Sequence, residues 1–303
     1  MRIVVIGSSN TDMIIRGPRI PRPGETILGG SFSTSAGGKG ANQAVAAARA
    51  GGEVTFIARL GDDILGTQAL EGYRSDGINV EHVSLDPEEP TGVALIVVDD
   101  QGENSISVAS GANMSLSCDL IDDAHKTIKS AEILLMQLET PLESVVWAAQ
   151  LANSAGVRVI LNPAPAQILT DDLLKMLDVI TPNESEAEIL TGIAVTDVDS
   201  AEKAARCLLD RGVDSVIITL GKKGALVSTS EYTELVPGFQ LETVDTTAAG
   251  DVFNGTLCVT LANGKSLLEA TRFANAAAAL SVTKLGAQRS IPNAQEISTF
   301  LNA

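Results

Sequence analysis

Several residue types on which particular chemistries depend are scarce in this chain of 303 residues. Phe, Trp and Tyr together make up only 3%, which disfavours, without excluding, a pocket that stacks on a nucleobase. The three cysteines, Cys118, Cys207 and Cys258, are scattered and odd in number, so a disulfide framework is not expected. The two histidines, His82 and His125, lie far apart and no CxxC spacing occurs, so the sequence gives no support for a zinc site or a Ser-His-Asp triad.

Positive charge and long apolar runs are also in short supply. Lys and Arg number 21 against 38 Asp and Glu, a formal net charge of -17, so neither a nucleic acid nor an anionic membrane is expected as a partner. Any phosphate must therefore be bound by local groups. No apolar run reaches the length of about 18 residues that spans a membrane, and the start of the chain, MRIVVIG, leads into a strand pattern rather than a signal peptide. A cytoplasmic location is expected.

Hydrophobic residues, at 45%, form short runs that alternate with helical patterns. The runs RIVVIG, VTFIARLG, AEILLMQL, VRVILN, DVITPN and SVIITLG are typical of buried strands. Several predicted helices end at a glycine, as at Gly156, Gly212 and Gly286. The alternation predicts an α/β fold, an open and mainly parallel sheet with helices on both faces, in a single domain over residues 1–303.

Two segments depart from this alternation. Residues 13–35 are rich in Pro and Gly with short strand-like pieces, and residues 91–109 contain two alternating strands around Asp-Asp-Gln-Gly, a hairpin pattern. We expect them to pair into a small second sheet, which in an α/β enzyme is a candidate lid. The alternative is a structural extension that does not move.

Polar residues recur at or just after the ends of the predicted parallel strands. Singly, each is explained as a turn former or a cap, but open parallel sheets bind ligands along this edge. The repeated placement therefore favours a ligand cleft. The residues are Asn10, Asp12, Glu139, Asn162, Asn183, Thr219 and Gly221.

A glycine-rich stretch, SAGGKGANQ at 35–43, enters an alanine-rich helix without matching a phosphate-binding loop. In place of the Walker pattern, Lys39 is followed by Gly40, and no G-x-G-x-x-G occurs after the first strand. Gly37 and Gly38 are expected to let the backbone approach a small ligand closely. With Asn10, Asp12, Lys39 and Asn42 nearby, a hydroxyl-rich molecule is predicted, the alternative being a tight turn with a surface lysine.

The stretch Asn183-Glu-Ser-Glu186 has the spacing of a helix capping box, and on spacing alone we interpret it as structural.

The stretch TVDTTAAGDVFN at 243–254 places small residues ahead of an apolar helix. Unobstructed amides at a helix start, together with the helix dipole, attract an anion such as a transferring phosphoryl group. Asp251 follows directly, so it could be an ordinary first-turn cap or, beside such a nest, a general base for an attacking hydroxyl. We favour the second interpretation.

Two of these stretches resemble the signatures of the ribokinase-like (PfkB) carbohydrate kinases. They are GGKGANQAVAAAR at 37–49 and DTTAAGDVFNG at 245–255, and the similarity extends through PGET at 23–26 and NAAAA at 275–279. Within that family the first motif is most similar to the ribokinase branch. The resemblance implies ATP-dependent phosphorylation of D-ribose at its 5-hydroxyl, giving D-ribose 5-phosphate and ADP.

Other functions on the same fold stay open. One is a kinase for another pentose or a nucleoside, such as deoxyribose, pseudouridine or adenosine. Another is a non-catalytic sugar-binding sensor, although a sensor would be expected to lack the base. A nicotinamide-dependent dehydrogenase is disfavoured because the glycine fingerprint is missing.

The resemblance also implies roles for individual residues. Asp251 would be the base, with an anion hole at 248–251 that uses the amides of Ala249 and Gly250. Sugar contacts would come from Asn10, Asp12, Gly38, Lys39, Asn42, Glu139 and Asp251. ATP contacts would come from Asn183, Thr219, Gly221, Gly224, Gly250 and Asn275.

Two cations and a dimer are implied in the same way. Mg²⁺ would accompany ATP under the indirect influence of Glu186, which gives the 183–186 stretch a role beyond capping. An activating K⁺ would be bound by Asp245, Thr247, Ser281, Lys284, Gly286 and Ser290, several through backbone carbonyls. The small sheet would act as a lid and as the interface of a homodimer. The sequence departs from the family pattern at Ala248, where glycine is preferred, and at Arg289, where a smaller residue or proline is common.

Overall fold

One twisted sheet runs through the centre of the molecule. The computed structural model describes residues 1–302 and orders the strands as β13 (Thr233–Pro237), β12 (Gly224–Thr229), β11 (Ser215–Thr219), β10 (Val179–Ile180), β9 (Arg158–Leu161), β8 (Ile133–Met136), β1 (Arg2–Ile6), β4 (Glu53–Gly61) and β5 (Asn79–Asp86). Neighbours from β11 to β5 pair in parallel, and only β11–β12 and β12–β13 are antiparallel. The mainly parallel sheet predicted from the apolar runs is confirmed.

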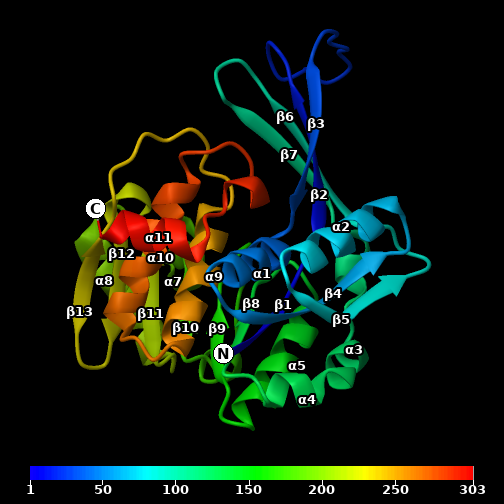
Figure 1. Ribbon diagram of the computed structural model, residues 1–303. Coiled ribbons are helices and arrows are strands. Elements are labelled where there is room, and N and C mark those ends of the chain that lie inside the picture. The colour runs from blue at the N-terminus through cyan, green and yellow to red at the C-terminus, as the bar shows by residue number, and fades with distance from the viewer. Residues whose placement is uncertain (303) are drawn as a thin grey trace.

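Helices cover both faces of this sheet (Figure 1). One face carries α1 (Lys39–Arg49), α2 (Ile64–Ser75), α9 (Ala249–Ala262), α10 (Leu267–Ser281) and α11 (Ala294–Leu301). The other carries α3 (Cys118–Asp123), α4 (His125–Lys129), α5 (Leu142–Asn153), α6 (Asp171–Leu174), α7 (Glu184–Thr191) and α8 (Val198–Asp210). Side chains alternate across a strand, so in β1 Ile3 and Val5 pack into the first layer, and Val4 and Ile6 into the second.

The helix predicted to run to Gly286 ends earlier, at Ser281. The carbonyl of Val282 accepts hydrogen bonds from the amides of Val244 (2.7 Å) and Asp245 (3.2 Å), so it is not available to a further helical turn. The Gly286 amide likewise donates to the carboxylate of Asp245, at 2.9 Å. Tertiary contacts with the loop before α9 therefore outweigh the local helical pattern over the last five residues of the prediction.

The expected small second sheet is present and projects away from the main one (Figure 1). Its strand order is β3 (Ser31–Gly37), β2 (Asn10–Arg16), β6 (Gly92–Val98) and β7 (Asn104–Ala109). The predicted hairpin turns at Asp99–Gly102, where Asp99 Oδ1 accepts the amides of Gln101 and Glu103. Asn10 and Asp12 lie within β2, so the small sheet brings two polar candidates to the edge of the main sheet.

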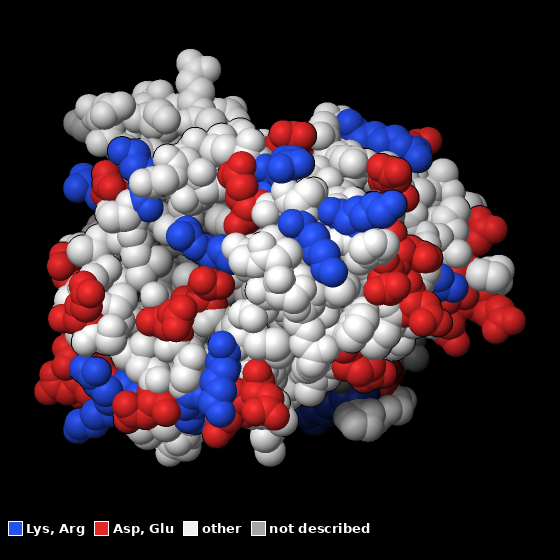
Figure 2. All heavy atoms as spheres, turned by 90° about the horizontal axis from the view of Figure 1, so that it is seen from below, with Lys and Arg blue, Asp and Glu red and all other residues white. Residues whose placement is uncertain are grey.

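Among the described residues, no helix combines the length and apolar character that crossing a membrane requires. On the face opposite the small sheet, Lys and Arg are interspersed with Asp and Glu (Figure 2). The acidic composition therefore appears there as a mixed surface rather than as one field of a single sign.

Candidate active site

Asp251 lies in the first turn of α9 and is 7% exposed. The helix begins at Ala249, and its N-cap residue, Ala248, has a φ of 61°, the one positive φ at a non-glycine residue between 1 and 302. A left-handed conformation costs an L-residue roughly 1–2 kcal/mol, which explains physically why glycine suits this position. Strain of this kind persists where the surrounding structure enforces it, commonly at functional sites.

The helix start carries two unpaired amides. The Ala249 amide donates to the carbonyl of Thr246 at 3.2 Å, whereas those of Gly250 and Asp251 have no acceptor in the described part of the chain. No side chain caps the helix, and Gly250 is exposed. The free donors of the nest are therefore Gly250 and Asp251, one residue later than the pair Ala249 and Gly250 expected from the sequence.

Two side-chain amides from α1 hold the Asp251 carboxylate. Asn42 Nδ2 donates to Oδ2 and Gln43 Nε2 donates to Oδ1, each at 2.9 Å. Gln43 is itself oriented, because its Oε1 accepts from Gln137 Nε2 at 2.6 Å and its Nε2 also donates to Asn162 Oδ1 at 3.0 Å. Sequence reasoning assigned no role to Gln43 or Gln137. The only signal was the position of Gln43 beside Asn42 within the glycine-rich motif.

These amides reach Asp251 because α1 and α9 pack very closely. A Cβ added at Gly255 would lie 2.6 Å from both the Ala46 Cβ and the Gln43 carbonyl oxygen. Contacts that short do not occur between real side chains, so only glycine lets the two helix backbones meet here. The glycine in the second signature motif thus sets the distance between Asp251 and its donors.

The titration of the site is shifted by burial and by mutual charge. Burial raises the pKa of Asp251 to about 6, although Lys39 and the Asn42 and Gln43 amides favour the charged form. The pKa of Asp12 is also raised to about 6, first by burial and then by Glu139 and Asp251. Burial disfavours the charged form of Lys39, but the surrounding carboxylates outweigh it and raise its pKa, so the ammonium persists among them.

The predicted sugar ligands come together between the two sheets. Glu139 accepts the Lys39 amide at 3.1 Å and the hydroxyl of Ser8. Added Cβ atoms would lie 2.5 Å from the Asp12 carboxylate at Gly37 and 2.6 Å from the Asn10 amide at Gly38, where φ is 88°. Gly37 therefore lets the backbone approach the Asp12 side chain, and Gly38 lets it approach the main chain of Ser9 and Asn10.

A cavity of about 400 Å³ opens beside the start of α9. Its wall includes five of the predicted ATP residues, together with Ala249 and an apolar side formed by residues such as Phe239, Phe253 and Val282. The sixth, Asn183, lies next to Thr219 through an isolated parallel bridge. The five in the wall are Thr219, Gly221, Gly224, Gly250 and Asn275.

The capping box read from Asn183-Glu-Ser-Glu186 is present. Asn183 Oδ1 accepts the Glu186 amide at 2.8 Å, and Glu186 Oε2 accepts the Asn183 amide at 2.9 Å. Burial raises the pKa of Glu186, and Lys39 is among the charges that act on it. The carboxyl therefore both caps α7 and lies near the charged groups of the site.

The candidate cation ligands lie on two stretches that Asp245 joins. One is the loop before α9, with Asp245 and Thr247, and the other runs from Ser281 at the end of α10 through Lys284 and Gly286 to Ser290, in the 3-10 turn Gln288–Ser290. The Asp245 carboxylate accepts from the Thr247 amide and hydroxyl, at 2.9 and 2.6 Å, and from the Gly286 amide. Burial alone would raise the pKa of Asp245, but these hydrogen bonds outweigh it and hold the pKa below its ordinary value. The loops offer carboxylate, hydroxyl and carbonyl oxygens, a hard donor set that fits K⁺. Within residues 1–302, no cluster of three or more His, Cys, Asp and Glu forms a metal site.

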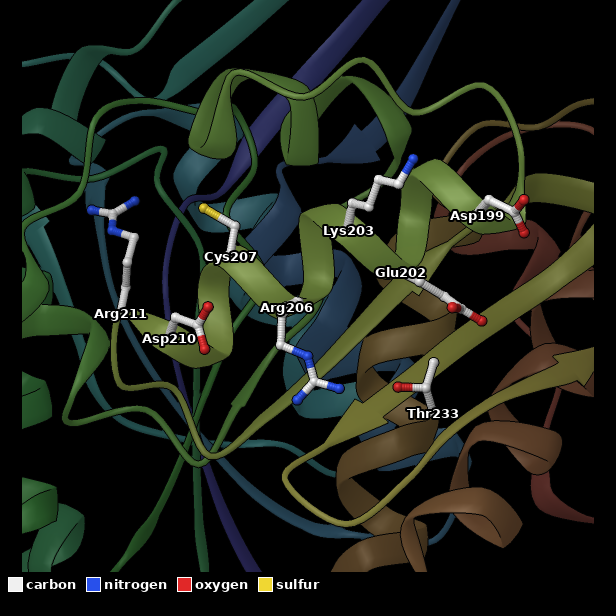
Figure 3. A pocket seen from close by; sticks show the side chains of 8 residues that line it. All are labelled: Asp199, Glu202, Lys203, Arg206, Cys207, Asp210, Arg211 and Thr233. Carbon is white, nitrogen blue, oxygen red and sulfur yellow. The ribbon is translucent and has the colours of Figure 1, made fainter.

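A separate hollow of about 740 Å³ lies along α8 beside Thr233 (Figure 3). Charged side chains of both signs line it, including Glu202, Lys203 and Arg206, and none of the predicted site residues is among them. The predicted chemistry belongs to the cleft at α9.

Comparisons with known proteins identify the family of the chain. The model of the pfkB family carbohydrate kinases matches residues 1–294. The chain is 50% identical to the ribokinase of Haemophilus influenzae over 299 residues, which cover 99% of this chain and 98% of the relative. It is 39% identical to the deoxyribokinase of Salmonella typhi over 303 residues, covering 100% and 99%. A solved structure of Arabidopsis thaliana ribokinase complexed with ribose and ATP is similar with a TM-score of 0.93 at 34% identity, covering 99% and 98%.

Proposed function

Since the chain belongs to the pfkB family of carbohydrate kinases, we propose that it transfers the γ-phosphoryl group of ATP to the 5-hydroxyl of D-ribose, giving D-ribose 5-phosphate and ADP. The observation that carries this proposal is the position of Asp251. Its buried carboxylate lies beside two free amides, between the cluster of candidate sugar ligands and the cavity that holds five candidate ATP residues. The cytoplasm, where ATP is made, is the proposed location.

In the proposed mechanism, Asp251 accepts the proton of the 5-hydroxyl as its oxygen attacks the γ-phosphorus in line with the leaving ADP. The amides of Gly250 and Asp251, at the positive end of α9, stabilise the charge on the phosphoryl oxygens. Sugar hydroxyls are oriented by Asn10, Asp12, Gly38, Lys39, Asn42 and Glu139. Mg²⁺ bound with ATP would supply neutralising charge at the phosphates, and Glu186, whose carboxyl is near enough to Lys39 and Asp251 for their charges to act on it, is the residue proposed to influence that ion.

The choice of acceptor is tested by coupled ADP release with ribose, deoxyribose, fructose, adenosine and pseudouridine, each with magnesium–ATP and K⁺. Preferential turnover of ribose supports the proposal. Deoxyribose is the second candidate because a deoxyribokinase is 39% identical over the whole chain. Sugar binding without turnover of any acceptor would support the sensor and contradict the kinase.

We further propose that oxygens of the Asp245 loop and of residues 281–290 would hold K⁺, whose positive charge would support the active form of the start of α9. Replacing K⁺ with Na⁺ or tris should lower kcat without unfolding the protein, since the two layers of the main core do not depend on the ion. Asp245→Asn should abolish the difference between the cations. Equal turnover in all three would remove this role from Asp245.

The small sheet is proposed to act as a lid and as the interface of a homodimer. Cross-strand pairing places Ile14, Ile96 and Ile106 on the face that carries Asp12, and Ile15, Phe32 and Leu95 on the other. Ile15, Phe32, Leu95 and Ile106 are each 48–65% exposed. A sheet with apolar residues on both faces is expected to cover the sugar with one face and pack against a second copy with the other.

A further inference from the structure

Asn113 lies in η1 (Gly111–Ser115), directly after the last strand of the small sheet, and no sequence motif singled it out. Its side chain is 1% exposed. A buried amide needs partners for both its oxygen and its nitrogen, so the identity of those partners shows what the residue holds in place.

The side-chain amide of Asn113 connects the residues at the start of β2 with those that follow β7, where the small sheet meets the rest of the molecule. Its Nδ2 donates to Asn10 Oδ1 (2.8 Å), to the Ser9 carbonyl (3.1 Å) and to the Ser110 carbonyl (2.9 Å). Its Oδ1 accepts the Ser9 amide at 2.8 Å. Ser9 and Asn10 lead into β2, and Ser110 follows β7, so this one side chain connects the first and the last strand of the small sheet.

These bonds set the direction of the Asn10 amide. Because Asn10 Oδ1 is engaged by Asn113, the Nδ2 group is the end left for a ligand, and no acceptor in residues 1–302 contacts it. The site is otherwise rich in acceptors. Burial raises the pKa of Asp12, and the carboxylates of Glu139 and Asp251 lie close enough to raise it further. A donor at Asn10 complements them, because a sugar hydroxyl both donates and accepts.

Gly92 provides the space that this arrangement needs. It pairs with Asn10 in register, and a Cβ added there would lie 2.2 Å from Asn10 Oδ1 and 2.4 Å from Asn113 Nδ2. Any side chain at this position would push the two amides apart. Gly92 thus offers a second, independent way to disturb the same hydrogen bond.

We propose that Asn113 is a positioning residue for the sugar acceptor, which holds the Asn10 amide with Nδ2 toward the substrate hydroxyls from the base of the small sheet. This inference rests on the proposed function, in which Asn10 contacts the sugar. Asn113 touches no substrate in this scheme and acts only through Asn10.

A double-mutant cycle tests the inference. Asn113→Asp keeps the shape and the acceptor for the Ser9 amide but cannot donate to Asn10 Oδ1, so the Asn10 amide should reverse. We expect the KM for ribose to rise by about 10–100-fold, the range for leaving one buried polar contact unmatched, with kcat and the KM for ATP within about twofold. In an Asn10→Ala background, Asn113→Asp should cause no further rise.

Gly92→Ala should give the same selective rise in the KM for ribose. Asn263→Asp is the control, because Asn263 is the C-cap residue of α9, at the end of the helix away from Asp251, and this variant should change neither the KM for ribose nor the KM for ATP. The inference would be overturned if Asn113→Asp had the same effect in the parent and in the Asn10→Ala background. It would also be overturned if kcat fell while the KM values for ribose and for ATP both rose. Failure of both the Asn113 and Gly92 variants to fold would overturn it too, because the role would then be structural. A parent enzyme inactive on ribose would instead contradict the proposed function, and the cycle would be measured with the acceptor that it does phosphorylate.

Discussion

At the scale of single residues, the site balances burial against hydrogen bonding. Asp251 is surrounded by protein, which favours its neutral form, yet Asn42 and Gln43 both donate to its oxygens and favour the charged form. The result is a carboxyl with a pKa of about 6, high enough to make it a stronger base than an exposed aspartate and low enough to be charged at neutral pH.

Asp251→Asn should fold and bind ribose, while kcat falls by roughly 10²–10⁴, the usual contribution of a positioned acid–base group. Because the pKa of this carboxyl is raised in the folded state, its charged form destabilises the fold. The neutral asparagine variant should therefore be at least as stable as the parent at pH 8. Steady-state kinetics and urea unfolding measure the two effects. Turnover close to that of the parent would show that Asp251 is not the base.

The pH profile provides a second prediction. As pH falls through about 6, Asp251 takes up a proton and can no longer accept one from the substrate. Below this pH, kcat/KM should fall about tenfold for each pH unit, and more steeply where Asp12 also takes up a proton. Unfolding is not expected to cause this fall, since groups with raised pKa values add stability as they become protonated. In Asp12→Asn, a plot of log kcat/KM against pH should keep a slope of one on its acidic side. A profile that stays flat to pH 5 would contradict the assignment.

At the scale of elements, the chemistry depends on how α1 meets α9. The first helix supplies the two amides and the second supplies the carboxylate, and both are placed by a glycine contact one turn beyond Asp251. The strained conformation of Ala248, the N-cap residue of α9, then exposes the free amides of Gly250 and Asp251. A change to the packing of these two helices should therefore affect stability and catalysis together.

Gly255→Ala should destabilise the fold by about 1–3 kcal/mol, the cost of overpacking a close contact, and should lower kcat because the two helices are pushed apart. Gly72→Ala is the matched control. Gly72 lies in α2 with nothing within 4 Å of an added Cβ, so its substitution should stabilise the helix by about 0.5–1 kcal/mol and leave kcat unchanged. Denaturant unfolding and kinetics on both variants distinguish packing from helix propensity. Equal effects at the two sites would contradict the close-contact argument.

At the scale of the whole molecule, the small sheet is the least covered element. It projects from the main body with Ile15, Phe32 and Leu95 exposed on one face, whereas the main sheet is covered on both sides (Figure 1). Exposed apolar residues gathered on one surface are typical of an interface.

Leu95→Asp should therefore weaken self-association by at least about 100-fold, because a carboxylate would have to be desolvated in the interface. Analytical ultracentrifugation across a range of concentrations measures the change. Ile189→Asp, on α7 and 58% exposed in the parent, is the control and should leave association unchanged. A parent that is monomeric at all concentrations, or equal effects of the two variants, would refute the interface.

The sequence by itself determined the layered α/β fold, the small sheet and the two motifs that carry the chemistry. These are local features. Alternating apolar runs report which residues face a core, and a run of Thr, Ala and Gly before an apolar helix predicts unobstructed amides. It also predicted the capping box at Asn183, because that contact joins residues only three positions apart.

Only the tertiary structure decided features that depend on segments far apart in the chain. Gln43 reaches Asp251 across 208 positions, and Asn113 reaches Asn10 across 103. The end of α10 at Ser281 was predicted five residues too late, since the carbonyl that ends it is bound by a distant loop. Local sequence patterns do not predict such contacts. The energy of these contacts comes from burial and from hydrogen bonds that form only when the chain folds and brings distant segments together.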